Sequence, residues 1–425
     1  MNTFAKGSTA ALAITILTLF ATVTHSAEPF LERQDIFVGG TEPYHTYRRP
    51  AIAVTNKGTL LAFCQAHRYD AEDTGDIDIL LRRSFDGGKS WEAPQVVWDE
   101  TMSSCSNPTV VVDRDSGRIW VLMGWSYYAD TLEDILKGHF VTNTGSMNRT
   151  YQAYIVHSND DGASWSALAS MEHVTELVKK PEWRLFKPGP GAGIQLRHGP
   201  HKGRLIIPCA FSSFGKDCGY DGFSDIYAIH DYVHFGSYFV YSDDQGSSWQ
   251  RSEGMVWPWM GECQIVELDD GRLMLNMQNY YRKQKCRAVA TSEDGGSTWS
   301  EAIFDTTLVD PVSQAGFVQY TRNGTDDRNR LLFSNPADPD KPRNLTVRLS
   351  YDDGQFWPVK KVIEPGEAGD SALAVLGDGS IGLVYEQGSY ERIVFARFNL
   401  EWLTDGKDYL PLVPQGGLPT FDDKP

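Results

Sequence analysis

Apolar residues along this chain come in short runs, many of them alternating with polar residues, and turn-forming residues separate the runs. One run reads Ile-Asp-Ile-Leu-Leu over 77–81, and another spans Tyr151 to Val156. Runs of this length, bounded by Gly, Asp and Pro, are typical of strands, and no long stretch after Glu28 has a helical period. The pattern therefore predicts a single all-β domain over residues 28–425.

Two segments differ from this pattern of short strand-like runs. The segment Trp125–Thr150, which includes Asp130–Lys137, is expected to hold a short helix, and Pro181–Gly203 is expected to be a Gly/Pro-rich loop that borders a functional site. No linker separates a second domain.

The pattern Ser-x-Asp-x-Gly-x-x-Trp occurs five times. The copies start at Ser84, Ser158, Ser242, Ser292 and Ser350 and end at Trp91, Trp165, Trp249, Trp299 and Trp357. Asp accepts hydrogen bonds from nearby backbone amides and Gly takes a positive φ, so each copy suits a hairpin turn. The starts are 74, 84, 50 and 58 residues apart, which fits the roughly 40 to 50 residues of a four-stranded propeller blade plus insertions. We therefore expect these aspartates to be structural.

Residues 1–26 have the features of a secretory signal, with Lys6 ahead of an apolar stretch from Ala10 to Val23. They predict a secreted or periplasmic protein. No later segment approaches twenty apolar residues, so no membrane span is expected. A net charge of -17 argues against nucleic acid or an anionic membrane as a partner.

The six cysteines are too few and too scattered for a disulfide-built scaffold, and their spacing is not that of a zinc site. Cys209 and Cys218 could pair across a hairpin or loop, or could be isolated buried thiols. We expect no required metal or other cofactor.

The five boxes, together with Tyr-Arg-Arg-Pro-Ala at 47–51, resemble the sialidase (exo-neuraminidase) family. Further matching segments extend over most of the chain, including 189–196, 262–268, 334–336 and 344–348. The resemblance implies a six-bladed β-propeller of four-stranded antiparallel blades with Asp-box turns. It also implies a glycosidase that removes a terminal sugar from a glycan or glycoconjugate.

The resemblance assigns Arg48 to the first of three arginines that bind the sialic acid carboxylate, a role that suits a guanidinium group. Arg68 and Asp73 fit the Arg and Asp that follow in the family, which makes Asp73 the general acid/base. Close rivals of Asp73 are Asp70, Asp76 and Asp78.

Three further roles follow from the same resemblance. Glu262 matches the glutamate that polarises a nucleophilic tyrosine, and Glu386 matches the carboxylate that steadies the first arginine. Arg343 is the best match to the third arginine, with Lys341 and Arg348 as competitors.

The chain departs from the family at two positions. Gln278 stands where the second binding arginine is expected, and Asp370 stands where the catalytic tyrosine is expected. A carboxylate nucleophile would be repelled by the carboxylate on the anomeric carbon of a sialoside. The two changes together favour a substrate without that carboxylate, with Asp73 and Asp370 forming the carboxylate pair of an ordinary glycosidase.

Three interpretations remain open. The first is an exo-glycosidase of altered specificity. The second is a working exo-α-sialidase, in which Arg282 or Arg287 supplies the missing charge and Tyr280 or Tyr320 supplies the nucleophile. The third is a carbohydrate-binding propeller without catalytic activity. In each case Trp257 and Trp259 are candidates to stack on a sugar ring.

Overall fold

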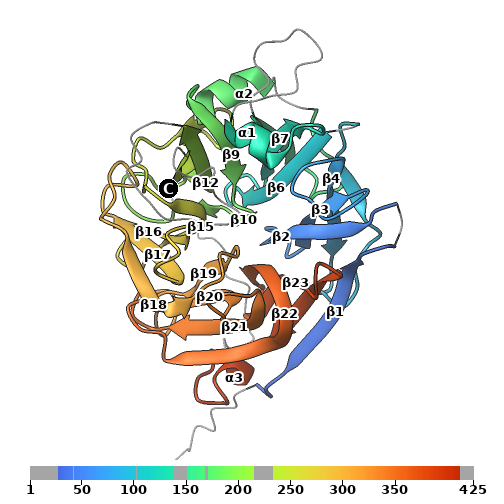
Figure 1. Ribbon diagram of the computed structural model, residues 1–425. Helices are drawn as coiled ribbons and strands as arrows, with labels where there is room; N and C mark the ends of the chain where they lie inside the picture. The colour runs from blue at the N-terminus through green and yellow to red at the C-terminus, as the bar shows by residue number, and fades with distance from the viewer. Residues whose placement is uncertain are drawn as a thin grey trace, which may run out of the picture.

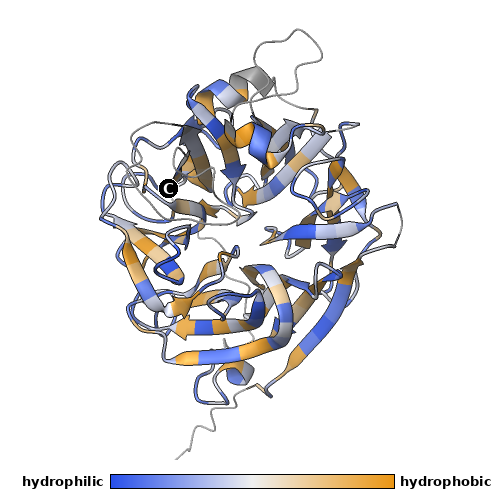
Figure 2. Cartoon of the chain, viewed as in Figure 1, coloured by the Kyte–Doolittle hydropathy of each residue, from blue (hydrophilic) through white to orange (hydrophobic). Residues whose placement is uncertain are grey.

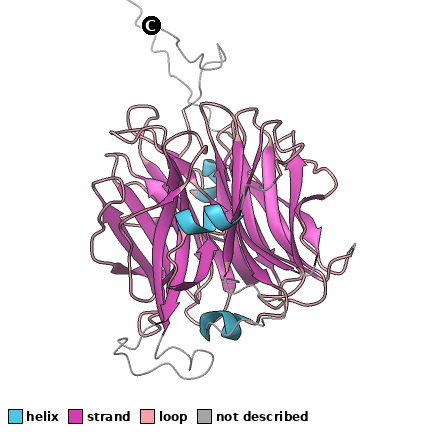
Figure 3. Cartoon of the chain, turned by 90° about the horizontal axis from the view of Figure 1, so that it is seen from above, coloured by secondary structure: helices cyan, strands magenta, loops and turns pink. Residues whose placement is uncertain are grey.

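The chain folds into antiparallel sheets arranged around a common centre, and helices are few and short (Figure 1, Figure 3). The structure is a computed structural model that describes residues 27–41, 43–101, 103–137, 151–167, 171–214 and 233–411. The predicted leader 1–26 and Cys218 lie outside these residues. The predicted all-β propeller is confirmed, while the number of blades stays a prediction.

Strands that follow one another in the chain mostly pair with one another, as short connections favour. One eight-stranded sheet contains β2 (Thr46–Val54), β3 (Leu60–His67), β4 (Ile77–Ser84), β5 (Gln95–Trp98), β6 (Ser103–Val112), β7 (Ile119–Tyr127) and β8 (Gln152–Ser158). The next sheet contains β9 (Trp183–Pro188), β11 (Ile194–Gln195), β12 (Leu205–Phe214), β13 (Val233–Ser242) and β14 (Gln250–Arg251), while β10 (Gly191–Ala192) pairs with β6.

The second half of the chain forms a four-stranded sheet and a seven-stranded one. The four-stranded sheet contains β15 (Met260–Glu267), β16 (Leu273–Asn279), β17 (Cys286–Ser292) and β18 (Ile303–Val309). The seven-stranded sheet contains β19 (Gly316–Thr321), β20 (Arg330–Pro336), β21 (Arg343–Ser350), β22 (Val359–Val375), β23 (Ile381–Gln387), β24 (Arg392–Phe398) and β1 (Leu31–Val38).

Strand β1 joins the two ends of the described chain. It pairs antiparallel with β24, from Leu31 opposite Phe398 to Val38 opposite Arg392. The long strand β22 likewise serves two neighbours, because its first half pairs with β21 and its second half with β23. Figure 2 shows hydrophilic residues interspersed with hydrophobic ones along β21 and β22. These pairings close the sheets around the centre and fix the inner strands that carry the site.

The five repeated boxes form matching turns that join neighbouring sheets. In the first, Ser84 Oγ accepts the Gly88 amide at 2.8 Å, and Asp86 Oδ1 accepts the Ser90 amide at 2.9 Å. Gly88 has a φ of 88°, and a Cβ there would lie 2.1 Å from the Phe395 ring. The box tryptophans pack on aromatic rings, three of them on a neighbouring sheet; the pairs are Trp91–Phe395, Trp165–Phe63, Trp249–Trp120, Trp299–Phe239 and Trp357–Phe333. The boxes therefore act as joints between sheets, which explains their repetition.

In the described residues, three short helices lie outside the sheets: α1 (Leu132–Lys137), α2 (Met171–Val178) and α3 (Leu400–Leu403). The short helix predicted within Trp125–Thr150 is thus confirmed as α1, and residues 138–150 lie outside the described residues. Ile135 of α1 and Val178 of α2 join an apolar cluster with Trp183 and Phe211. None of the described helices is long and apolar enough to cross a membrane.

The predicted loop Pro181–Gly203 is wrong in part, because it contains β9, β10 and β11. Trp183, Leu185 and Phe186 are buried in β9, which pairs with β12. The glycines and prolines of 188–193 dominate the sequence signal for a loop and hide the short strands on either side. The segment does border the site, as its contacts with Glu262 show.

Candidate active site

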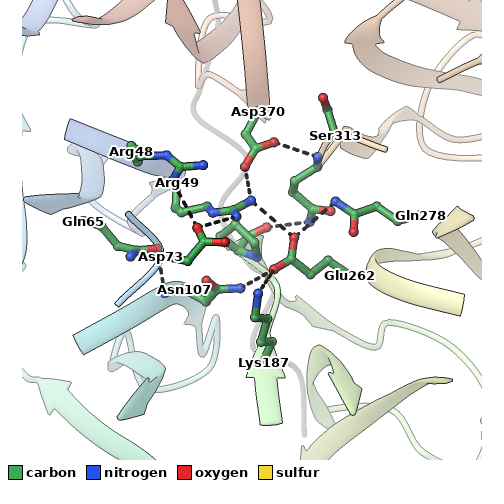
Figure 4. Close-up of polar contacts among 12 residues, drawn as sticks. Arg48, Arg49, Gln65, Asp73, Asn107, Lys187, Glu262, Gln278, Ser313 and Asp370 are labelled. Carbon is green, nitrogen blue, oxygen red and sulfur yellow. Dashed lines mark hydrogen bonds and ion pairs between the residues drawn. The ribbon is translucent and has the colours of Figure 1, made fainter. Parts of the chain in front are cut away.

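Inner strands β2, β6, β15 and β22 each carry a break in the pairing register. The breaks lie between Arg48 and Ala51, Ser106 and Thr109, Met260 and Cys263, and Ala368 and Ser371. A β-bulge inserts extra residues and redirects a side chain, and bulges are common next to active sites. Each break here contains a polar residue of one cluster, and Figure 4 shows these side chains converging from different strands.

Arg48 and Arg49 both reach this cluster, although neighbouring residues of a regular strand face opposite sides. Arg49 lies within the bulge and has a φ of 54°, in the left-handed region. As a result both guanidinium groups bind Asp73, with Arg48 Nη1 at 3.0 Å and Arg49 Nη2 at 3.3 Å from its Oδ1. Arg48 also lies over the Tyr390 ring, 4.1 Å from its centroid.

Arg49 lies between three carboxylates. Its Nη1 is 2.6 Å from Asp370 Oδ2 and 3.5 Å from Glu262 Oε2, while its Nη2 binds Asp73. Burial favours the neutral form of Arg49, but the three carboxylates outweigh burial and raise its pKa above the usual value. One guanidinium group therefore bridges Asp73 and Asp370, which brings the two carboxylates of the predicted pair within about 9.5 Å of each other.

Glu262 is buried and receives polar contacts from several strands. Asn107 Nδ2 donates to Oε1 at 2.8 Å, and Gln278 Nε2 donates to Oε2 at 3.2 Å. Lys187 Nζ of β9 lies 3.7 Å from Oε1. Glu262 thus has hydrogen-bond or ion-pair partners at both oxygens, which a buried carboxylate requires.

Asp370 is held by the backbone as well as by Arg49. Its Oδ1 accepts the Gln314 amide at 2.8 Å, and its own amide donates to Glu386 Oε2 at 3.1 Å. Glu386 Oε1 accepts the Arg49 amide at 2.9 Å. A Cβ on Gly369 would lie 2.3 Å from Glu386 Oε2, so only glycine fits beside this carboxyl group. Glu386 therefore ties the strands of Arg49 and Asp370 together.

The environment of the cluster shifts the pKa values of two carboxyl groups in opposite directions. Burial and the nearby Asp370 raise the pKa of Glu386 to about 7, against the opposing effect of Arg48 and Arg49. Burial also works to raise the pKa of Asp73, but Arg49, Lys187 and Arg48 outweigh it and hold that pKa well below its usual value. In this state Asp73 is an ionised carboxylate, and Glu386 is the group that takes up a proton near neutral pH.

Glu386→Gln should reduce the pH dependence of stability. An unfolded glutamate has a pKa of about 4.3, so between about pH 4.3 and 7 folded Glu386 keeps a proton that the unfolded chain has released. This group therefore lowers stability as pH rises through that window, by about 4 kcal/mol in total. Asp73 acts in the opposite sense, because its stabilisation is present above about pH 3.9 and is lost as pH falls.

Urea unfolding at pH 5 and pH 8 measures this effect. The fall in unfolding free energy between the two values should be smaller in Glu386→Gln than in the unsubstituted protein, and Glu391→Gln, at an exposed ion pair, should leave it unchanged. An equal fall in all three proteins would contradict the assignment.

The structure brings together six of the eight residues singled out in the sequence: Arg48, Asp73, Glu262, Gln278, Asp370 and Glu386. Arg68 lies apart from them, paired with Asp78 at 2.7 Å, Asp99 at 3.2 Å and Asp76 at 3.3 Å. Arg343 is half exposed and pairs with Asp338 at 2.6 Å. The substrate-binding roles of Arg68 and Arg343 stay predictions.

The rival residues have contacts of their own. Asp78 is buried and accepts the Tyr44 hydroxyl at 2.6 Å, and Asp70 accepts the Glu72 amide. Arg348 donates to Asn335 at 2.9 Å, Arg282 to the carbonyls of Asp310 and Pro339, and Arg287 to Asn276 and the Ser313 carbonyl. The Tyr320 hydroxyl donates to the Gly379 carbonyl. Apart from Tyr280, whose hydroxyl donates to Gln278 at 3.3 Å, none of these contacts involves a residue of the cluster.

Sequence reasoning gave no role to Arg49, Lys187 or Asn107. Arg49 stands next to Arg48 in the Tyr-Arg-Arg-Pro segment, which was the one available signal. Trp257, a candidate for sugar stacking, is exposed, whereas Trp259 is buried. Cys209 is a buried free thiol. Among the described residues, no three His, Cys, Asp or Glu side chains are grouped to hold a metal ion.

Comparison with known proteins gives the same family. Residues 58–394 match the model of the BNR repeat-like domain. The chain is 35% identical over 390 residues to a sialidase of Micromonospora viridifaciens, which covers 90% of this chain and 56% of that protein. It is 28% identical over 363 residues to a sialidase of Bacteroides fragilis, covering 82% of this chain and 61% of the relative.

Among solved structures, the Hadza microbial sialidase Hz136 superposes with a TM-score of 0.71 at 27% identity, over 87% of this chain and 69% of that chain. The chain thus spans little more than half the length of the two curated relatives. The family model nevertheless covers most of the chain. The chain therefore belongs to the BNR repeat-like domain family and is a sialidase-family protein.

Proposed function

We propose that this protein is an exo-glycosidase that hydrolyses a terminal sugar without a carboxylate on its anomeric carbon. The observation that carries the proposal is the Arg49 guanidinium, which bridges Asp73 and Asp370. A pair of carboxyl groups within about 9.5 Å is the usual equipment of glycoside hydrolases. The predicted leader, which lies outside the described residues, supports action on glycans outside the cytoplasm.

In the proposed reaction Asp73 donates a proton to the glycosidic oxygen as the bond to the anomeric carbon breaks. Asp370 either attacks that carbon, forming an ester that water later hydrolyses, or takes a proton from the attacking water. If the ester forms, Asp73 then accepts the proton of the water. Because Arg49 keeps Asp73 ionised, the acid form requires that the sugar weaken the Arg49–Asp73 contact when it binds.

The charge balance of the cluster supports a substrate that is neutral at this carbon. Arg48, Arg49 and Lys187 all have carboxylate partners within the protein. Asp370 stands against Arg49, where it would repel a carboxylate on the adjacent carbon of the substrate. A sialoside would therefore have to compete with Asp370 for Arg49.

A working exo-α-sialidase is the second candidate, and two observations favour it. Arg49 and Lys187 add cations that could replace the arginine missing at Gln278. The Tyr280 hydroxyl donates to Gln278, which in turn donates to Glu262, so a tyrosine is linked to this carboxylate. The sialidases among the relatives support the same alternative.

Release of a fluorogenic aglycone from a panel of glycosides tests both candidates. The panel contains the N-acetylneuraminide and several neutral and uronic sugars. We expect turnover of a sugar other than the neuraminide, reduced by about 10²-fold or more in Asp73→Asn. Asp70→Asn, in the same segment but outside the cluster, should keep full activity.

Turnover of the neuraminide alone would establish the second candidate and refute the first. Saturable sugar binding without turnover of any glycoside would contradict both and indicate a carbohydrate-binding propeller.

A further inference from the structure

A hollow lies at the ends of the inner strands opposite those that carry the active-site cluster. It is a cavity of about 330 Å³, and strands β2, β6, β15, β19 and β22 all contribute to its wall. In β15, Val266 lines the cavity and Glu262 belongs to the active-site cluster. Four residues of strand correspond to about 13 Å, so the cavity is separate from the cluster. Figure 1 shows these strands surrounding the centre of the molecule.

The wall of the cavity is mixed, with apolar side chains next to charged and polar ones. Val54, Ile194, Val318 and Val375 line it and are each partly exposed rather than buried. Apolar surface in a cavity of this size is a typical setting for a small-molecule ligand, because burying that surface stabilises the complex.

Three arginines line the same cavity: Arg114, Arg197 and Arg322. Arg322 is buried and pairs with Glu267 at 3.3 Å. Arg114 donates to the Val54 carbonyl at 2.9 Å and to Asn56 at 3.2 Å, and it has no carboxylate partner among the described residues. Within the same described ranges, the guanidinium group of Arg197 has neither a hydrogen bond nor an ion pair, since only its backbone amide is engaged.

The positive charge here is not balanced by the protein. Besides Glu267, the lining contains one carboxylate, Asp326, which accepts the backbone amide of Arg322. Arg114 and Arg197 line the same cavity, where their like charges repel each other. Two adjacent arginines without carboxylate partners are unusual in a chain of net charge -17. A bound anion would relieve their repulsion.

We propose that this cavity binds a small monoanion with an apolar body, of the class of medium-chain carboxylates. The carboxylate would lie between Arg114 and Arg197, because guanidinium groups match carboxylate geometry. The hydrocarbon part would lie against Val54, Ile194, Val318 and Val375.

Isothermal titration calorimetry with octanoate tests the proposal. The unsubstituted protein should bind octanoate saturably, at one site, and more tightly than acetate or 1-octanol, which supply only the head or only the chain. The double variant Arg114→Ala/Arg197→Ala should bind octanoate at least ten-fold more weakly, because it lacks both charged contacts. Both side chains are exposed, so the variant should fold.

Arg392→Ala is the matched control, since it removes a partly exposed arginine on β24 that pairs with Asp35, away from the cavity. It should bind octanoate as the unsubstituted protein does. Octanoate binding weaker than about 10 mM, equal binding in the double variant, or equal affinity for 1-octanol would each overturn the proposal.

Discussion

Under the proposed mechanism, Asp370→Asn should abolish glycoside hydrolysis, with a fall in kcat on the order of 10⁴-fold or more. Asn has nearly the same shape as Asp and keeps an oxygen that can accept the Gln314 amide, so the backbone contact remains. It cannot attack the anomeric carbon or accept a proton from water. The loss should therefore appear in kcat rather than in folding.

The measurement is steady-state turnover of the preferred glycoside, together with the unfolding midpoint as a check on the fold. A double variant provides a second test of the role of Asp370. Asp370→Tyr/Gln278→Arg introduces the two residues expected in sialidases and should also lose activity on the preferred glycoside. Asp370→Asn with kcat within about ten-fold of the unsubstituted protein would exclude Asp370 from the chemistry.

The fold was predictable from sequence because its signals are local and repeated. Each box needs Gly where φ is positive and a neighbouring ring is close, as at Gly88, and a Trp that packs on another aromatic residue. Such requirements recur at every joint and remain visible in a single sequence. The short strands β9 to β11 could not be predicted, because Gly and Pro residues are concentrated between them.

The site was predictable only where a motif carried the residue. Arg48, Asp73, Glu262, Asp370 and Glu386 came from family motifs, and the structure brings them together. Arg49 was missed because alternation along a strand predicts that it faces away from Arg48, and a bulge with a positive φ cannot be read from these residue types. The sequence does not indicate Lys187, because the glycines and prolines of its segment predict a loop where β9 forms.

Long charged side chains were the hardest to place. Arg68 follows its predicted spacing, yet Asp76, Asp78 and Asp99 surround its guanidinium group. Arg343 likewise forms an ion pair with Asp338, five residues before it. Sequence spacing predicts where the backbone of an arginine lies in a strand. The side chain has several rotatable bonds, so its guanidinium group can pair with any of several nearby carboxylates.

Arg49→Ala should be the most damaging single change for stability and activity together. It leaves Asp73, Asp370 and Glu262 without their shared cation, and breaking a buried ion pair in this way costs about 3 to 5 kcal/mol. Without Arg49, burial should raise the pKa of Asp73, so the loss of stability should grow as pH rises. Turnover should fall by about 10³-fold or more, because the two carboxylates lose the group that positions them.

Arg49→Lys separates charge from geometry. Lys keeps the positive charge but cannot bridge two carboxylates with two nitrogens, so it should restore much of the stability at neutral pH and little of the turnover. Urea unfolding at pH 5 and pH 8 and the pH dependence of kcat measure the two effects. If Arg49→Ala retained both its stability and its turnover, Arg49 would not organise this site, and the bridge between Asp73 and Asp370 would have no part in catalysis.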